Sequence, residues 1–212
     1  MIKYNKIKLD FDDRAIFNDF SLEIVKGEKV VLLGKSGLGK SSLFGLILGF
    51  IQPKSGKVLF DGAPVDEHTI WHVRQNVAFV DQDVSIGDYK VSDWFSFVAG
   101  IKSNHSLNFG EERVNELMDF FELSHDLLDK DISALSGGER QRVAIIVSVL
   151  LSRRVFLLDE VTSALDKNLK KKTADFFIGR EDWTVVSISH DAVWLDNPNV
   201  KVFDLEKKAW KQ

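Results

Sequence analysis

The sequence predicts an α/β protein built around a mostly parallel sheet. Short apolar runs alternate along the chain with stretches that have the period of amphipathic helices. Two of the runs, Val30–Leu33 and Val155–Leu158, are continuously apolar, which is typical of strands buried on both faces of a parallel sheet. The first is followed by a glycine-rich loop and the second by two carboxylates. Both strand ends therefore carry residues suited to binding a ligand.

The remaining elements can be assigned in chain order. Phe20, Leu22 and Ile24 alternate with polar residues and predict a half-buried strand before the first apolar run. Further strands are expected at Val58–Phe60, Val77–Val80 and Val185–Ile188, and a last, more exposed strand around Val200, Val202 and Leu205. Helical periods occupy Lys40–Phe50, Glu111–Glu122 and Arg140–Leu151. Residues 91–135 contain helix-like stretches and no convincing strand, which predicts a helical insertion into the sheet.

The composition excludes several classes of protein. The 212 residues are enough for one good-sized domain. The 28 Lys and Arg against 32 Asp and Glu give a net charge of −4, which argues against a nucleic-acid partner held by phosphate neutralisation. The absence of cysteine excludes disulfides, thiolate catalysis and iron–sulfur clusters. The N-terminus has no apolar signal segment, and no apolar run approaches the ~18 residues of a membrane span.

The loop after Val30–Leu33 has the pattern of a phosphate-binding loop. Gly34–Ser41 fits G-x-x-x-x-G-K-[ST] between a strand and a helix, the context that this motif requires. Its glycines let backbone N–H groups point at phosphate oxygens, Lys40 would reach the β- and γ-phosphates, and the Ser41 hydroxyl would ligate Mg²⁺. The sequence thus predicts a nucleoside triphosphate site. The predicted nucleotide contacts in this loop are Gly34, Lys35, Ser36, Gly37, Leu38, Gly39, Lys40, Ser41 and Ser42.

The apolar strand Val155–Leu158 ends in Asp159 and Glu160. The C-terminal ends of parallel strands collect the ligands of α/β sites. Asp159 is therefore placed to hold Mg²⁺, and Glu160 to accept a proton from a water that attacks the γ-phosphate.

A third candidate site begins the helical run Arg140–Leu151. Ser136-Gly137-Gly138-Glu139 has the spacing of a capping box. Two glycines in a first helical turn cost roughly 1 kcal/mol each relative to alanine. This pattern favours a backbone that an anionic ligand approaches closely, and a flexible entry loop before a buried helix is the alternative.

Several motifs resemble those of one family. Leu135–Arg142 is similar to the signature motif of the ATPases of ATP-binding-cassette (ABC) transporters. Thr162–Asp166 resembles the D-loop of that family, and Ser187–Asp191 its switch-histidine strand end. Gln82 matches the Q-loop glutamine, and Phe11 stands where the family has an aromatic residue that stacks on adenine. The motifs occur in the family's order and cover essentially the whole chain.

The resemblance implies a fold and its division. The expected fold is an ABC-type P-loop nucleoside triphosphatase with a mostly parallel core sheet, N-terminal antiparallel strands and a helical insertion subdomain. One domain would span residues 1–212. Its catalytic core would comprise 1–86 and 136–212, and the helical subdomain about 87–135.

The resemblance also implies partners. Two copies would pair head to tail as a homo- or heterodimer, with each ATP between the phosphate loop of one copy and Ser136, Gly137 and Gly138 of the other. Asp166 would cross the dimer interface. A separate membrane permease would hold the chain peripherally on the cytoplasmic face of the membrane, and no nucleic acid is expected.

Within the site, the resemblance implies the role of each group. Glu160 would be the general base, His190 would contact the γ-phosphate, and Lys40 would complete the catalytic set. Mg²⁺ would be held by Ser41, Asp159 and Gln82, and Gln82 would also report the nucleotide state to a partner.

The chain departs from the family pattern at three positions. Val161 stands where the family usually has proline, Ser148 where it has arginine in the signature helix, and Lys35 where proline is frequent. None of these changes removes a phosphate, metal or base group. Phe17 and Tyr4 remain alternatives to Phe11 as the adenine-stacking residue.

Three functions compete at this stage. The first is the ATPase subunit of a transporter whose membrane domain is a separate chain. The second is an ABC-type ATPase acting on DNA, ribosomes or a division complex, and the third is a small-molecule kinase, which leaves Ser136–Arg142 unexplained. For the first, we expect a groove beside Gln82 that accepts a short helix of the permease. Its candidate anchors are Val84, Ile86, Tyr89, Val91, Trp94, Phe95 and Phe97.

Overall fold

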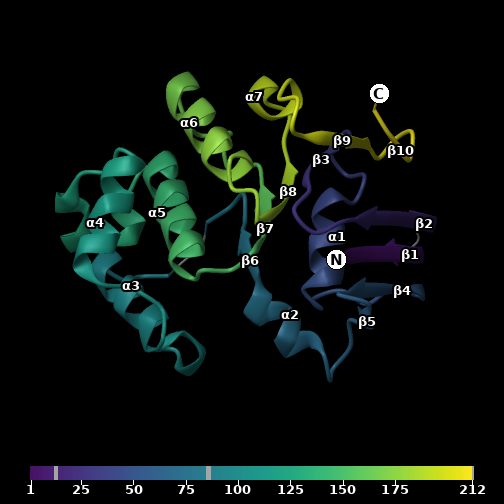
Figure 1. The fold of residues 1–212 in the computed structure, drawn as a ribbon, viewed down its shortest axis with the longest axis horizontal. Coiled ribbons are helices and arrows are strands. Elements are labelled where there is room, and N and C mark those ends of the chain that lie inside the picture. Colours follow the sequence, from purple (N-terminus) through teal and green to yellow (C-terminus); the bar gives the residue numbers. More distant parts are fainter. Residues whose placement is uncertain (12–13, 85–86, 212) are drawn as a thin grey trace.

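A computed structural model describes residues 1–11, 14–84 and 87–211. It contains two sheets that share a core between them, and most of the helices lie on the outer face of the larger sheet (Figure 1). The prediction of an α/β fold with a mostly parallel core sheet and N-terminal antiparallel strands is confirmed.

The smaller sheet is antiparallel, with the order β2-β1-β4-β5. Its strands are β1 (Ile2–Phe11), β2 (Arg14–Ile24), β4 (Ser55–Phe60) and β5 (Ala63–Pro64). Along β1 the inward side chains do not keep a period of two, because the register shifts between Tyr4 and Ile7 and Lys6 takes a positive φ. This irregularity explains why the sequence pattern alone did not reveal β1.

The larger sheet has the order β10-β9-β3-β8-β7-β6, and all neighbours except β10 and β9 are parallel. Its strands are β3 (Lys29–Leu33), β6 (Val77–Val80), β7 (Val155–Asp159), β8 (Thr184–Ile188), β9 (Lys201–Asp204) and β10 (Ala209–Trp210). All residues of β7 and β8 are buried, as expected for strands that are covered on both faces, and these include the polar residues Asp159, Thr184 and Ser187. The strand expected around Val200, Val202 and Leu205 is β9, and it is more exposed than β7 and β8, since Lys201 is exposed and Asp204 is half-buried. Val202 and Phe203 are buried because β9 pairs with β3, and β10 takes the edge.

The helices cover the two faces of the larger sheet. Helix α1 packs between the two sheets, and α5 and α6 cover the opposite face (Figure 1). The helices are α1 (Lys40–Ile47), α2 (Ile70–Asn76), α3 (Val91–Gly100), α4 (Glu111–Phe120), α5 (Gly137–Leu150), α6 (Lys167–Ile178) and α7 (Ala192–Leu195). Three 3₁₀ turns occupy Lys102–Asn104, His125–Asp129 and Ile132–Ala134. Helix α2 escaped the sequence analysis because only Val73 of it is buried.

Residues 91–135 form α3, α4 and the three 3₁₀ turns and contain no strand. Their buried side chains join those of α5 and of β7 in one core, and Phe120 and Phe121 pack against Phe176 of α6. The helical segment is thus fastened to α6 through aromatic side chains. Among the described residues, no helix is long and apolar enough to cross a bilayer.

Candidate nucleotide site

The glycine-rich loop joins β3 to α1 and so ends at the N-terminus of a helix, a position that favours an anion. Gly39 lies at the N-cap position of α1 with a left-handed φ of +90°. A Cβ there would lie 2.8 Å from Cζ of Phe17 and would also meet Ile16. Strand β2 therefore presses against the loop, and only glycine fits at this point.

Lys40 is 8% exposed and its ammonium is held inside the loop. Its Nζ donates hydrogen bonds to the carbonyl oxygens of Gly34, at 2.6 Å, and of Lys35, at 3.0 Å. The positive charge is thus kept at the centre of the loop by neutral acceptors, which a phosphate oxygen could replace.

The end of β7 meets the start of α1. The Ser41 hydroxyl donates a hydrogen bond of 2.6 Å to Oδ2 of Asp159. Burial raises the pKa of Asp159 above its usual value, and the carboxylates of Asp81 and Glu160 act in the same direction, against the hydrogen bond from Ser41 and the charge of Lys40. Because burial makes this carboxylate harder to ionise, a nearby cation would stabilise its charged form.

Glu160 takes a left-handed conformation with φ of +47°. Such a conformation costs a non-glycine residue about 1–3 kcal/mol and persists only where the surroundings enforce it. Here the Glu160 N–H donates to the Ile188 carbonyl at 2.9 Å, and the Ser163 N–H donates to the Glu160 carbonyl at 2.9 Å. The chain therefore turns sharply at Glu160 and brings it beside the end of β8.

These strand ends enclose a cavity of about 250 Å³. Of the predicted site residues, it is lined by Ser36, Gly37, Gly39, Lys40, Ser41, Ser42, Gln82, Asp159, Glu160 and His190. Three residues of the predicted loop set, Gly34, Lys35 and Leu38, do not line it. The structure thus brings the phosphate loop together with every group that the sequence proposed for metal binding and proton transfer.

Ser136, Gly137 and Gly138 do not line this cavity. Ser136 caps α5, and its side chain accepts from the Glu139 N–H while the Glu139 carboxylate accepts from the Ser136 N–H, which is the expected capping box. The hydrogen bonds from the Ser136 side chain and backbone lower the pKa of Glu139.

The two glycines differ in a way that the sequence could not reveal. A Cβ on Gly138 would lie 3.0 Å from the carbonyl oxygen of Ala164, so packing inside this chain accounts for that glycine. A Cβ on Gly137 would meet nothing within 4 Å. Gly137 therefore leaves an open helix N-terminus.

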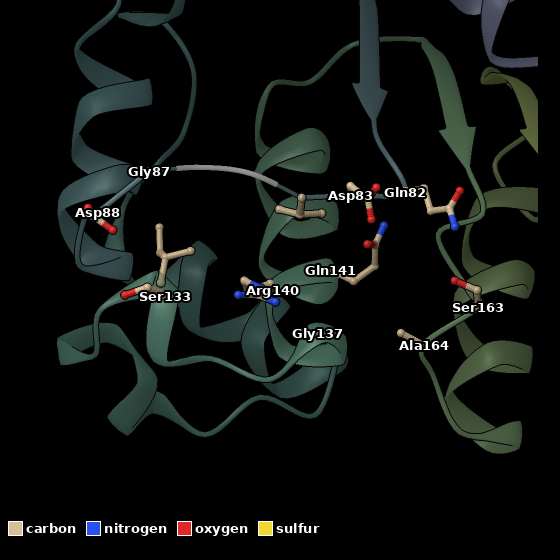
Figure 2. Close-up of a pocket in the computed structure, with 12 residues that line it drawn as sticks. Gln82, Asp83, Gly87, Asp88, Ser133, Gly137, Arg140, Gln141, Ser163 and Ala164 are labelled. Carbon is tan, nitrogen blue, oxygen red and sulfur yellow. The ribbon is translucent and has the colours of Figure 1, made fainter.

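A second cavity, of about 540 Å³, lies beside Gln82. Figure 2 shows that its walls come from the loop after β6, the 3₁₀ turn Ile132–Ala134, the first turns of α5 and the loop after β7. Gln82 and Gly137 both line it, so Gln82 borders the two cavities. Gln141 of α5 donates from Nε2 to the Asp81 carbonyl at 3.3 Å, a link between α5 and this loop that the sequence analysis missed.

The seven candidate anchors near Gln82 have different environments. Val91 and Phe95 are buried, and Trp94 is half-buried. Tyr89 and Phe97 are exposed and stack on each other with ring centres 6.1 Å apart. Val84 alone of the described candidates lines the second cavity, and Ile86 lies outside the described residues.

Two further predicted contacts lie apart from the first cavity. Phe11, at the end of β1, is 44% exposed, whereas Phe17 and Tyr4 are in the core, and the Tyr4 hydroxyl donates to the Leu43 carbonyl. Asp166 is exposed and caps α6, and its Oδ1 accepts from the N–H groups of Asn168 and Leu169.

A phosphate loop between β3 and α1, beside the acidic end of a parallel strand, defines a P-loop nucleotide-binding fold. Residues 17–163, more than half of the chain, match the family model described as ABC transporter. The chain belongs to the ABC transporter family.

Individual relatives agree with this assignment. The chain is 35% identical over 197 residues to a sulfate/thiosulfate import ATP-binding protein of Agrobacterium fabrum, covering 90% of this chain and 56% of the relative. It is 32% identical to an ATP-dependent lipid A-core flippase of Alcanivorax borkumensis, covering 78% of this chain and 29% of the relative. The chain thus spans about half, or less, of the length of these relatives.

Among solved structures, the chain resembles cbiO1 of Clostridium perfringens, described as part of the ABC transporter complex cbiONQ. The TM-score is 0.75 with 28% identity, and the match covers 95% of this chain and 83% of that one. The similarity of the two folds thus extends over nearly the whole chain.

Proposed function

We propose that the chain binds ATP with Mg²⁺, pairs head to tail with a second nucleotide-binding domain, and hydrolyses ATP to drive a separate membrane permease. The observation that carries this proposal is the first cavity, where Lys40, Ser41, Asp159, Glu160 and His190 converge. Family membership supports the same activity.

The loop supports phosphate binding in two ways. Its backbone N–H groups and the N-terminus of α1 favour an anion. The Lys40 ammonium is already aimed into the loop by carbonyl oxygens, so that a β- or γ-phosphate needs only to displace neutral acceptors. Phe11 is the aromatic residue available to stack on adenine, since Phe17 and Tyr4 are buried in the core.

The oxygen groups at the ends of β7 and α1 fit a magnesium ion. Ser41 and Asp159 already lie in hydrogen-bond contact, and Gln82 lines the same cavity. The described residues contain no group of three or more acidic or histidine side chains placed to hold a metal ion, and Mg²⁺ typically uses one or two protein carboxylates together with substrate phosphates. When bound, Mg²⁺ would neutralise charge on the β- and γ-phosphates.

Glu160 and His190 supply the remaining chemistry. Glu160 follows the buried strand and lines the cavity, where its carboxylate would accept a proton from the attacking water. His190, at the end of β8, lines the same cavity and would donate a hydrogen bond to the γ-phosphate.

The position of α5 supports a dimer. The open N-terminus at Gly137 lies on a cavity different from that of the phosphate loop, so its preference for an anion would be met by nucleotide held on another copy. Asp166, exposed at the N-terminus of α6, is the neighbouring group that we expect at this interface.

The surface near Gln82 supports contact with a permease on the cytoplasmic face of a membrane. The second cavity is left to the partner's nucleotide, and the stacked pair of Tyr89 and Phe97, which follows Gln82 in the chain, is the exposed aromatic surface that we assign to the permease. Exposed aromatic residues of this kind are common anchors of protein interfaces.

The test is Glu160→Gln. The variant keeps shape and ATP binding but removes the base, so hydrolysis should fall on the order of 100-fold or more, and ATP should stabilise a dimer in gel filtration. Glu112→Gln, on the exposed first turn of α4, is the control. Near-wild-type hydrolysis by Glu160→Gln would show that Glu160 is not the general base. Release of phosphate without a phosphorylated acceptor would separate this function from a kinase.

A further inference from the structure

The loops that carry Glu160 and His190 are joined by a partly buried polar cluster. Oδ2 of Asp191 accepts a hydrogen bond of 2.6 Å from the Thr162 hydroxyl. Oδ1 of the same carboxylate accepts one of 2.7 Å from Nζ of Lys170. Thr162 stands two residues after Glu160, and Asp191 directly follows His190. One carboxylate therefore ties together the loop after β7, the loop after β8 and helix α6.

This cluster leaves few of its polar groups free. Thr162 is 1% exposed, and its Oγ1 also accepts from the indole N–H of Trp194 at 3.3 Å. The Asp191 N–H donates to Oγ of Ser189 at 3.1 Å. Burial opposes ionisation of Asp191, but the hydrogen bonds from Lys170 and Thr162 and the charges of Lys170 and His190 hold its pKa below the usual range. The carboxylate is thus kept charged, as its role as a double acceptor requires.

The cluster adds a second connection between the two loops. The first is the hydrogen bond from the Glu160 N–H to the Ile188 carbonyl, at the strand ends. The second, through Thr162 and Asp191, lies beyond the two functional side chains in sequence. With both connections, Glu160 is held between the end of β7 and Thr162, and His190 between the end of β8 and Asp191. These connections enforce the left-handed backbone at Glu160.

Lys170 has neighbours that make its role specific. It belongs to a run of three lysines on α6, of which Lys171 pairs with Asp175 of the same helix and Lys172 with Glu122. Lys170 alone turns its ammonium to the loop after β8, with its side chain 23% exposed.

We infer that Thr162, Lys170 and Asp191 are positioning residues that hold Glu160 and His190 in register for hydrolysis. This inference rests on the proposed function, because it presupposes the roles proposed there for Glu160 and His190. It assigns the three positioning residues no contact with nucleotide. A displacement of about 1 Å in a catalytic group can cost on the order of 100-fold in rate.

The test compares variants that differ by a single group. Thr162→Val removes the hydroxyl and keeps the shape, whereas Thr162→Ser keeps the hydroxyl. Thr162→Val should lower kcat by about 10- to 100-fold with an unchanged KM for ATP, and Thr162→Ser should retain most of kcat. Lys170→Ala should lower kcat in the same way, Lys170→Arg should restore it, and Lys171→Ala should be silent.

Folding and the proposed function are checked in the same series. Thermal denaturation identifies variants that fail to fold. If Thr162→Val fails to fold, Lys170→Ala replaces it as the test, because the Lys170 side chain is partly exposed. Amide exchange at Glu160 should accelerate in Thr162→Val, a readout that needs no hydrolysis. Wild-type kcat in folded Thr162→Val and Lys170→Ala, or equal losses in Thr162→Val and Thr162→Ser, would overturn the inference and leave the proposed function intact. No hydrolysis by the wild-type chain would overturn both.

Discussion

The contact between strand β2 and the phosphate loop gives a stability prediction that can be worked out from geometry. Gly39→Ala imposes a left-handed φ on alanine, which costs about 1–2 kcal/mol. The new Cβ would also meet Ile16 and Phe17, and overpacking of this kind costs about 1–3 kcal/mol. The variant should therefore lose about 2–5 kcal/mol of unfolding free energy.

Gly62→Ala is the matched control. Gly62 has a similar φ of +83°, but a Cβ there meets nothing within 4 Å. The backbone term and the change in unfolded-state entropy are common to both variants and cancel in their difference. The remaining difference, about 1–3 kcal/mol, corresponds to roughly 2–12 °C in Tm for a chain of this size. Urea and thermal denaturation measure it. Equal losses in the two variants would show that β2 does not constrain the loop.

The remaining predictions concern the second half-site, pH and docking. Gly137→Asp should leave folding and monomer nucleotide affinity intact, because a Cβ at this position has open space and acidic residues suit a first helical turn. The same variant should lose dimerisation and hydrolysis, which gel filtration and phosphate release would measure. The capping hydrogen bonds hold the pKa of Glu139 in the folded chain below its ordinary value of 4.5. Their contribution to stability is therefore complete above pH 4.5 and is lost as the pH falls through the pKa of the folded state. Glu139→Gln should flatten this acid dependence of Tm. Phe97→Asp should reduce recovery of the chain with membranes while ATP hydrolysis in solution persists, whereas Val25→Asp, also at an exposed apolar position, should not.

Most of the parallel sheet could be predicted because its strands are buried on both faces. Val155–Leu158 is a continuous apolar run, Val185–Ile188 is apolar except for Ser187, and these runs lie within the strands β7 and β8. Strand β1 and helix α2 could not be predicted in the same way. The first has a register shift that breaks its alternation, and the second is largely exposed, so neither has a periodic apolar pattern.

The candidate site divides along a similar line. Lys40, Asp159 and Glu160 were recognisable because they follow strands at fixed spacings, and the sheet brings strand ends together. The Asp191 cluster was not recognisable, because Thr162, Lys170 and Asp191 have no common spacing and meet only through the packing of α6 beside the ends of β7 and β8. The different reasons for Gly137 and Gly138 likewise depend on a carbonyl 26 residues away, at Ala164.

Gln82 is the point at which the two halves of the proposed mechanism meet. It lines the phosphate-loop cavity together with Asp159, and it also lines the cavity that contains Gly137. The adjacent Asp81 carbonyl accepts a hydrogen bond from Gln141 of α5, so the loop after β6 is fastened to the helix whose N-terminus would face the partner's nucleotide. A ligand bound at either cavity that moves Gln82 therefore acts on α5 as well. Because coupling between sites is a shared free energy, docking of a permease beside Gln82 should alter ATP affinity by the same factor by which ATP alters docking.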